Sequence, residues 1–199
     1  MPAFLSSVVY TCSAFLLGVV LVNQIVDYDL LYSQLTEASI EKAYVYYQTW
    51  WDAPVGVKAL LHVLAVSPVL ALILKLNAWT ESAIFFDGSA LVLQVATLIL
   101  YLTVHIPSLR TFLPPSPPAP AGTWSFLPPA VVPEVPPSAG DRADAVRVLA
   151  AGNALVAICL IGTIGMQAGQ EYARKTEERE QRLMDEKAQR EAERVKKDL

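Results

Sequence analysis

The sequence predicts an all-α, polytopic membrane protein, with a bundle of four transmembrane helices and a charged helical cytosolic tail. Of its 199 residues, 54% are apolar and only 17% are charged, which is too apolar for a soluble domain of this size. A helix needs about 20 mostly apolar residues to cross the hydrocarbon core of a bilayer. The chain holds four runs of about that length without Asp, Glu, Lys or Arg.

The predicted spans lie at residues 4–26, 57–76, 88–107 and 147–169. The second uncharged run is short, so we extend it through Lys58 and Lys75, whose long side chains reach the headgroups from the helix ends. The first run has no basic segment before it and is longer than the apolar core of a signal peptide, so we expect a retained helix. Cys12 and Cys159 lie within predicted spans, and no disulfide framework is expected.

Basic residues near the spans predict the orientation of the chain. The tail at 171–199 carries nine Lys or Arg, whereas the first loop has only Lys42 and the third loop only Arg110 and Arg142. The tail is therefore expected on the cytosolic side, and an even number of spans places the N-terminus there too. We divide the chain into a membrane domain at 1–170 and this tail.

The three loops differ in composition. In the first, at 27–54, acids are mixed with Tyr and Trp, and apolar positions recur at three and four, which predicts short amphipathic helices near the headgroups. These aromatic residues form either an anchoring belt or part of a face that contacts a partner. In the second loop Asp87, before Gly88, is the predicted N-cap of the third span. The third, at 108–146, is proline-rich and predicts an extended luminal linker.

The tail has no proline or glycine, and its charges pair at a spacing of four with the acid first, as in Glu171 with Lys175. This pattern predicts a solvated single helix that continues from the fourth span, with coiled-coil pairing as the alternative. Nine acids match the nine basic residues, which argues against a polybasic lipid-binding switch.

No catalytic constellation is visible in the sequence. His62 and His105 are single residues in apolar surroundings, and no His, Cys or carboxylate has the spacing of metal ligands. A glycine-rich phosphate loop and a basic, aromatic stripe for nucleic acid are also missing. We therefore expect no enzyme activity, no cofactor, no metal site and no nucleic-acid partner.

Amides within the predicted spans are the most informative polar residues: Asn23, Gln24, Gln94, Asn153 and Gln167. An amide in lipid needs a hydrogen-bond partner, which lies either on another helix of this bundle or on a second membrane protein. Under the second hypothesis, Asn153→Leu weakens the rescue of a client without lowering the abundance of this protein. Small residues in the fourth span, such as Gly162 and Gly165, suit close helix approach in either case.

Four stretches resemble one family: Phe15–Gly18 leading to Asn23 and Gln24, then Phe85–Leu93, Arg147–Asn153 and Met166–Ala173. They are similar to the fungal Shr-type packaging chaperones of the endoplasmic reticulum (ER), which are dedicated to amino-acid permeases. The resemblance implies a non-enzymatic membrane chaperone that prevents permease aggregation and supports packaging into COPII vesicles for export to the plasma membrane. Its partners would be amino-acid permeases in the lipid bilayer and COPII coat components at the tail.

On this interpretation Asn23, Asn153 and Gln167, with Gln24 beside them, are candidate client contacts, and Asp87 with Gly88 is a structural cap. Lys196 and Lys197 stand at the spacing of a dilysine signal for retrieval to the ER. Two other classes stay open: a permanent scaffold subunit of one membrane complex, which would co-purify stoichiometrically, and a small transporter, which would give flux in vesicles. The spans contain no deep acid or base and no broken-helix repeat, which disfavours transport.

Overall fold

The computed structural model describes residues 2–77, 80–111 and 138–197, with side chains at 4–77, 80–111 and 138–190. Every regular element in these ranges is a helix. Four helical segments are long and apolar enough to cross a membrane: Phe4–Leu31, Val55–Leu76, Ala83–Arg110 and Ala139–Arg190. The predicted fold class, an all-α membrane protein with four spans, is therefore confirmed.

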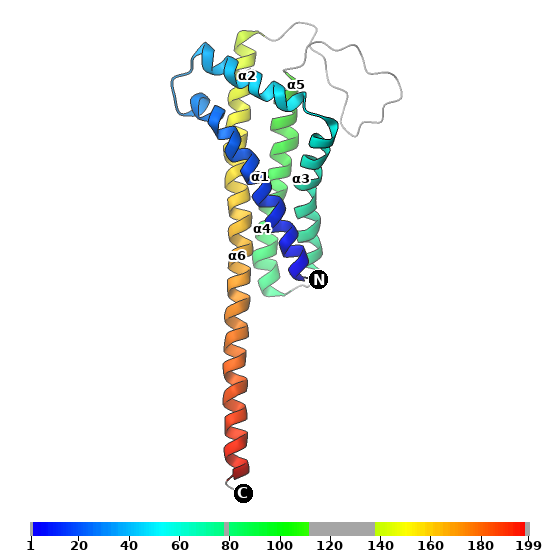
Figure 1. Ribbon diagram of the computed structural model, residues 1–199, viewed down its shortest axis with the longest axis vertical. Coiled ribbons are helices and arrows are strands. Elements are labelled where there is room, and N and C mark those ends of the chain that lie inside the picture. Colours follow the sequence, from blue (N-terminus) through cyan, green and yellow to red (C-terminus); the bar gives the residue numbers. More distant parts are fainter. Residues whose placement is uncertain (1, 78–79, 112–137, 198–199) are drawn as a thin grey trace, which may run out of the picture.

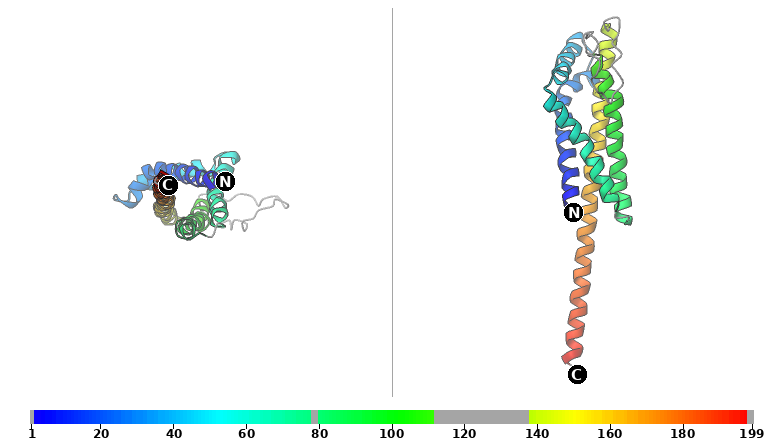
Figure 2. Two further views of the ribbon diagram at one scale, coloured as in Figure 1. Left: turned by 90° about the horizontal axis from the view of Figure 1, so that it is seen from below. Right: turned by 90° about the vertical axis from the view of Figure 1, so that its right-hand side faces the viewer.

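The long helices stand side by side in a ring (Figures 1 and 2). Helix α1 (Pro2–Leu31) packs against α3 (Val55–Leu76) and α6 (Ala139–Lys197), and α4 (Gly88–Leu100) packs against the same two helices. Among the described residues, no Cα atom of α1 lies within 8 Å of a Cα atom of α4, and the same holds for the other diagonal pair, α3 and α6. The bundle therefore has a centre that only side chains can fill.

The two ends of the bundle differ. The start of α1 lies at the end from which α6 projects as a long tail, and we call this the tail end (Figure 1). Helix α2 lies across the opposite end, which we call the α2 end. The connection at 112–137, where most of the proline-rich loop falls, lies outside the described residues.

The third span is one continuous helix that contains two π-helical turns. It consists of η1 (Ala83–Asp87), α4, η2 (Tyr101–His105) and α5 (Ile106–Arg110). A π turn inserts one extra residue and re-aims the side chains around it, and such turns are often found at functional sites. Asp87 and His105, the last residues of the two turns, both reach into buried polar networks described below.

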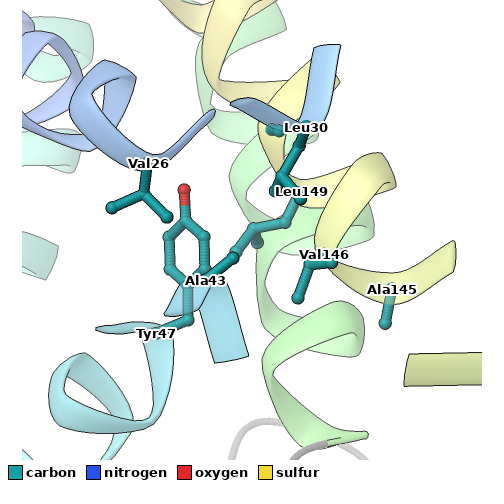
Figure 3. Close-up of a cluster of buried hydrophobic side chains, with 8 residues drawn as sticks. Val26, Leu30, Ala43, Tyr47, Ala145, Val146 and Leu149 are labelled. Atoms are coloured by element: carbon teal, nitrogen blue, oxygen red, sulfur yellow. The ribbon is translucent and has the colours of Figure 1, made fainter. Parts of the chain in front are cut away.

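Helix α2 (Glu37–Trp51) is the amphipathic element that the first loop predicts, as one helix of 15 residues. It starts at a capping box, in which the Thr36 and Ser39 side chains each accept a hydrogen bond from the other's backbone N–H. Its buried face, with Ala43 and Tyr47, packs on α1 and α6 in one apolar cluster (Figure 3). Other members of this cluster are Val26, Leu30, Ala145, Val146, Leu149 and Ala150.

Helix α6 runs unbroken over 59 residues, roughly 90 Å at the rise of an α-helix. The expected continuation of the fourth span into a helical tail is confirmed. Arg174 pairs with Glu171 at 2.7 Å and with Glu178 at 3.4 Å, and Lys175 pairs with Glu171 at 3.4 Å. The helix begins at Ala139, so the last residues of the loop expected at 108–146 are helical.

Glycines on α6 let the third span approach closely. A Cβ at Gly162 would lie 2.8 Å from Leu93 Cδ1, and one at Gly169 would lie 2.9 Å from Phe86 Cε1. Gly165 differs, because a Cβ there would meet no atom within 4 Å. Part of the small-residue pattern of the fourth span therefore serves packing within the bundle, and part of it faces outward.

Candidate functional site: two buried polar networks and a cavity

The tail-end network joins α3, η1 and α6 through Lys75, Asp87, Gln167 and Gln170. The Lys75 ammonium donates to Asp87 Oδ1 at 2.6 Å, to Gln167 Oε1 at 2.5 Å and to Gln170 Oε1 at 2.8 Å. Each glutamine in turn donates from Nε2 to Asp87, at 2.8 Å from Gln167 and 2.6 Å from Gln170. A lysine ammonium has three donors, so its hydrogen-bonding capacity is fully used.

This network corrects two expectations. Lys75 was expected to reach the headgroups, but it is only 8% exposed because Asp87 provides a buried counter-charge. Asp87 was expected to cap the third span with Gly88, but its side chain makes no capping hydrogen bond. The helix already runs through η1 into Gly88, so there are no free N–H groups to cap at this point.

The α2-end network joins α1, α2, η2 and α6 around Asn153. Asn153 Nδ2 donates to Asp27 Oδ2 at 2.8 Å and to the Tyr47 hydroxyl at 2.8 Å. His105 Nε2 donates to Asn153 Oδ1 at 2.8 Å, and the Tyr47 hydroxyl donates to Asp27 Oδ1. Beside it, Tyr46 donates to Asn23 Oδ1 at 2.8 Å. One amide on α6 therefore holds three other elements together.

The α2-end network keeps a carboxylate in the bundle without a direct cationic partner. Asp27 is fully buried, and among the described residues it forms no ion pair. It was expected to be the first residue of a loop, but α1 continues to Leu31 and carries it inside the bundle. Burial and the neighbouring Asp27 carboxylate raise the pKa of Tyr47, so its hydroxyl stays a donor at neutral pH.

Three of the candidate client contacts, Asn23, Asn153 and Gln167, are bonded inside the bundle and are 8%, 1% and 2% exposed. Of the two hypotheses for these amides, the geometry therefore favours hydrogen bonds between helices of this chain. Gln24 has a buried Nε2 with no partner among the described residues. Sequence reasoning missed Asp27, Tyr47 and Lys75 as network members, although their polar character in or next to apolar runs was visible.

The middle of the bundle contains a further buried amide, which has no hydrogen-bond partner among the described residues. Gln94 is fully buried on α4, and neither its Nε2 nor its Oε1 has a hydrogen-bond partner among the described residues. The Ser13 hydroxyl on α1 is also buried and unpartnered. Such groups lower stability, because they lose their bonds to water without replacement.

A cavity of about 330 Å³ lies inside the ring, in the half towards the α2 end. All four long helical units and α2 contribute to its walls, and Asn153 and His105 of the α2-end network face it. Among the described residues there is no cluster of three or more His, Cys, Asp or Glu that suits a metal ion. The features that remain for function are the two closed networks, the cavity and the exposed faces of the helices.

Comparison with known proteins identifies one family. Its model, for the Shr3-type chaperones and described as ER membrane protein SH3, matches residues 2–198, which is nearly the whole chain. No curated protein and no solved structure matches the chain.

Proposed function

We propose that this chain, which belongs to the Shr3-type family of ER membrane chaperones, shields newly inserted permease helices and then supports their loading into COPII vesicles through its tail. The family packages amino-acid permeases, so the chain is a membrane chaperone for these clients in the ER. The shielding surface, the role of the tail and the orientation in the membrane are the parts that we propose.

The observation that carries this proposal is the unbroken α6. Within the bundle this helix packs against α1 and α4, and beyond it the residues from 174 to 190 are largely exposed. A single helix thus joins the surface that meets clients in the membrane to a charged segment in solvent. This continuity supports a tail that presents the loaded chaperone to the export machinery.

We propose that both termini are cytosolic and that the α2 end is luminal. Nine Lys or Arg lie in the tail, and the positive-inside rule places such segments in the cytosol. The start of α1 lies at the same end of the bundle as the tail (Figure 1). The dilysine pair Lys196 and Lys197 would then be on the side where a retrieval signal is read, although their side chains lie outside the described part of the structure.

The proposed action is non-enzymatic. The polar side chains of the two networks are occupied with each other rather than converging on an open site. Multi-span permeases contain polar helices whose unpaired groups are costly in lipid until they pack. A bundle that lies alongside such helices lowers this cost without any covalent step.

Clients are proposed to contact the outward faces of α1 and α6. Gly18 and Gly165 are exposed, and a Cβ at either position would meet nothing within 4 Å. Apolar neighbours on the same faces are also exposed, as in Leu21 and Ile161. Small residues among apolar ones allow a second helix to approach closely.

Two variants test this surface against the interior of the bundle. Gly18→Leu and Gly165→Leu should reduce permease delivery to the plasma membrane while leaving the abundance of the chaperone unchanged. Gly162→Leu is the matched control, because its side chain would collide with Leu93 and should lower abundance instead. Normal permease delivery with both outward variants would contradict the proposed surface.

A truncation after Arg174 tests the role of the tail. Cells with the shortened chaperone should keep their permeases soluble on non-denaturing gels but retain them in the ER, as seen by microscopy. Cells that lack the whole protein should show aggregated permeases, while unrelated membrane proteins reach the surface. If the truncation exports permeases normally, the tail has no part in packaging.

A further inference from the structure

The cavity in the ring has the size and the walls of a small-molecule site. Its volume of about 330 Å³ falls within the range of ligand pockets, roughly 300–1,000 Å³. Most of its lining is apolar or aromatic. Its deeper walls include Leu16, Val20, Ala65 and Val156, which suit a hydrocarbon chain.

The charged side chains that line the cavity are cationic. Lys58 and Arg110 are part of the lining, and no Asp or Glu is, although the Asp27 carboxylate lies behind the lining residues Tyr47 and Asn153, which donate to it. Neither cation forms an ion pair within the described residues, although the chain as a whole has a net charge of −4. The Lys58 ammonium instead donates to the Trp51 carbonyl oxygen at 2.9 Å. Two cations without counter-charges, beside an apolar interior, complement an anionic head on an apolar chain.

The position of the cations matches the headgroup region. Lys58 lies in the first turn of α3, and Arg110 is the last residue of α5, so both are at the α2 end of their spans. The Lys58 ammonium lies 5.8 Å from the centre of the Trp51 ring. Tryptophan and long cations gather at the level of lipid headgroups.

The cavity is bordered by helices that are apart at this level. Among the described residues, no Cα atom of α3 lies within 8 Å of a Cα atom of η2 or α5, although side chains from all three line the cavity. Tyr101 Oη and His62 Nε2, which lie 3.0 Å apart, bridge the two sides. On this side of the ring the cavity is therefore closed by side chains.

A client helix fits the cavity less well than a slender group does. An α-helix with its side chains is 10–12 Å wide along its whole length. The cavity of about 330 Å³ lies between four helical units that pack on their neighbours around it. The part of the occupant that enters the ring is therefore slender.

We propose that the cavity binds one anionic glycerophospholipid. Its phosphate lies between Lys58 and Arg110, and part of one acyl chain lies against Leu16, Val20 and Ala65. This lipid fills the centre of the ring that protein side chains leave open. The proposal does not depend on the role of the tail or on the client surface.

Native mass spectrometry of the purified full-length protein tests this site. The protein is equilibrated in micelles with equal amounts of phosphatidylserine and phosphatidylcholine that carry the same acyl chains. We expect one phosphatidylserine to be retained at least tenfold better than phosphatidylcholine. Equal retention of the two lipids would overturn the proposal, as would retention of oleate in a parallel sample that retains no phosphatidylserine.

Matched variants locate the binding. Lys58→Gln with Arg110→Gln should reduce phosphatidylserine retention at least tenfold, whereas Arg174→Gln with Lys175→Gln on the exposed tail should not change it. Ala65→Phe places an aromatic ring in the cavity and should reduce retention at least tenfold with both cations in place. Circular dichroism and size-exclusion chromatography establish that each variant is folded. Wild-type retention by the folded double variant or by folded Ala65→Phe would contradict the site.

Discussion

The two polar networks lie near opposite ends of the bundle and stabilise a buried carboxylate in different ways. The tail-end network buries a cation and an anion together, Lys75 and Asp87, and two glutamine amides bridge them. The α2-end network buries one carboxylate, Asp27, and stabilises it with neutral donors from Tyr47 and Asn153. Both networks fasten α6 to the π turns of the third span.

Because of this difference, a substitution should lower stability by different amounts in the two networks. When one partner of a buried ion pair is removed, the other is left as an uncompensated charge, which costs several kcal/mol. When a neutral donor is removed, a carboxylate that keeps another donor loses less. We therefore expect the tail-end network to be the more sensitive of the two, and the predictions below test that order.

The largest effect is expected for Lys75→Met. The variant leaves Asp87 buried with only its two glutamine donors, and the free energy of unfolding should fall by about 3–5 kcal/mol. Unfolding by denaturing detergent in mixed micelles, followed by circular dichroism, measures this loss. Asp87→Leu should give a loss of similar size, because it leaves the buried Lys75 ammonium without a counter-charge.

The double variant, Lys75→Met with Asp87→Leu, provides the control for this prediction. It removes both charges together and should recover most of the lost stability, since two buried charges can often be replaced by apolar residues. Additive losses in the double variant would show that the two side chains act independently and would contradict the proposed pairing.

A smaller loss, about 2–3 kcal/mol, is expected for Asn153→Leu. The amide makes hydrogen bonds to Asp27, Tyr47 and His105, so its removal loosens three elements at once. We expect the abundance of the chaperone in cells to fall along with permease delivery. Normal abundance with failed delivery would instead support the alternative hypothesis, in which this amide captures clients.

Tyr47→Phe should lower stability by about 1–2 kcal/mol at neutral pH, because the hydroxyl no longer donates to Asp27. The pKa of Tyr47 is raised in the folded protein, whereas an unfolded tyrosine ionises at about 10. Its contribution is therefore present below pH 10 and lost as the pH rises above it. The difference in stability between wild type and variant, measured from pH 7 to 11, should shrink at the alkaline end.

The smallest expected effect is a gain in stability rather than a loss. Gln94→Leu replaces a buried amide without partners by an apolar side chain of similar size, and we expect a gain of about 1 kcal/mol. Thermal unfolding in detergent measures the gain. A more stable variant that no longer delivers permeases would show that this amide is kept for function; a less stable variant would show that it has partners in the folded protein.

The sequence was sufficient for the features that depend on local pattern. Uncharged runs of spanning length indicated the four long helices, apolar positions that recur at three and four in the first loop indicated α2, and acid-first pairs at a spacing of four indicated the tail helix. Each signal repeats over a few neighbouring residues, and its physical cause acts over the same range. The amides of the spans were also visible as groups that need partners.

Only the tertiary structure determines which hydrogen-bond and ion-pair partners the polar residues of the spans have. Lys75 and Asp87 were read as a headgroup anchor and a helix cap, because nothing local to either residue indicates the other. The bundle brings Asp87 against Gln167, 80 positions away, and Asp27 against Asn153, 126 positions away. Such pairings depend on how each helix is rotated about its own axis in the ring. In the third span the two π turns change this rotation, and the hydrophobic pattern of the sequence does not indicate them.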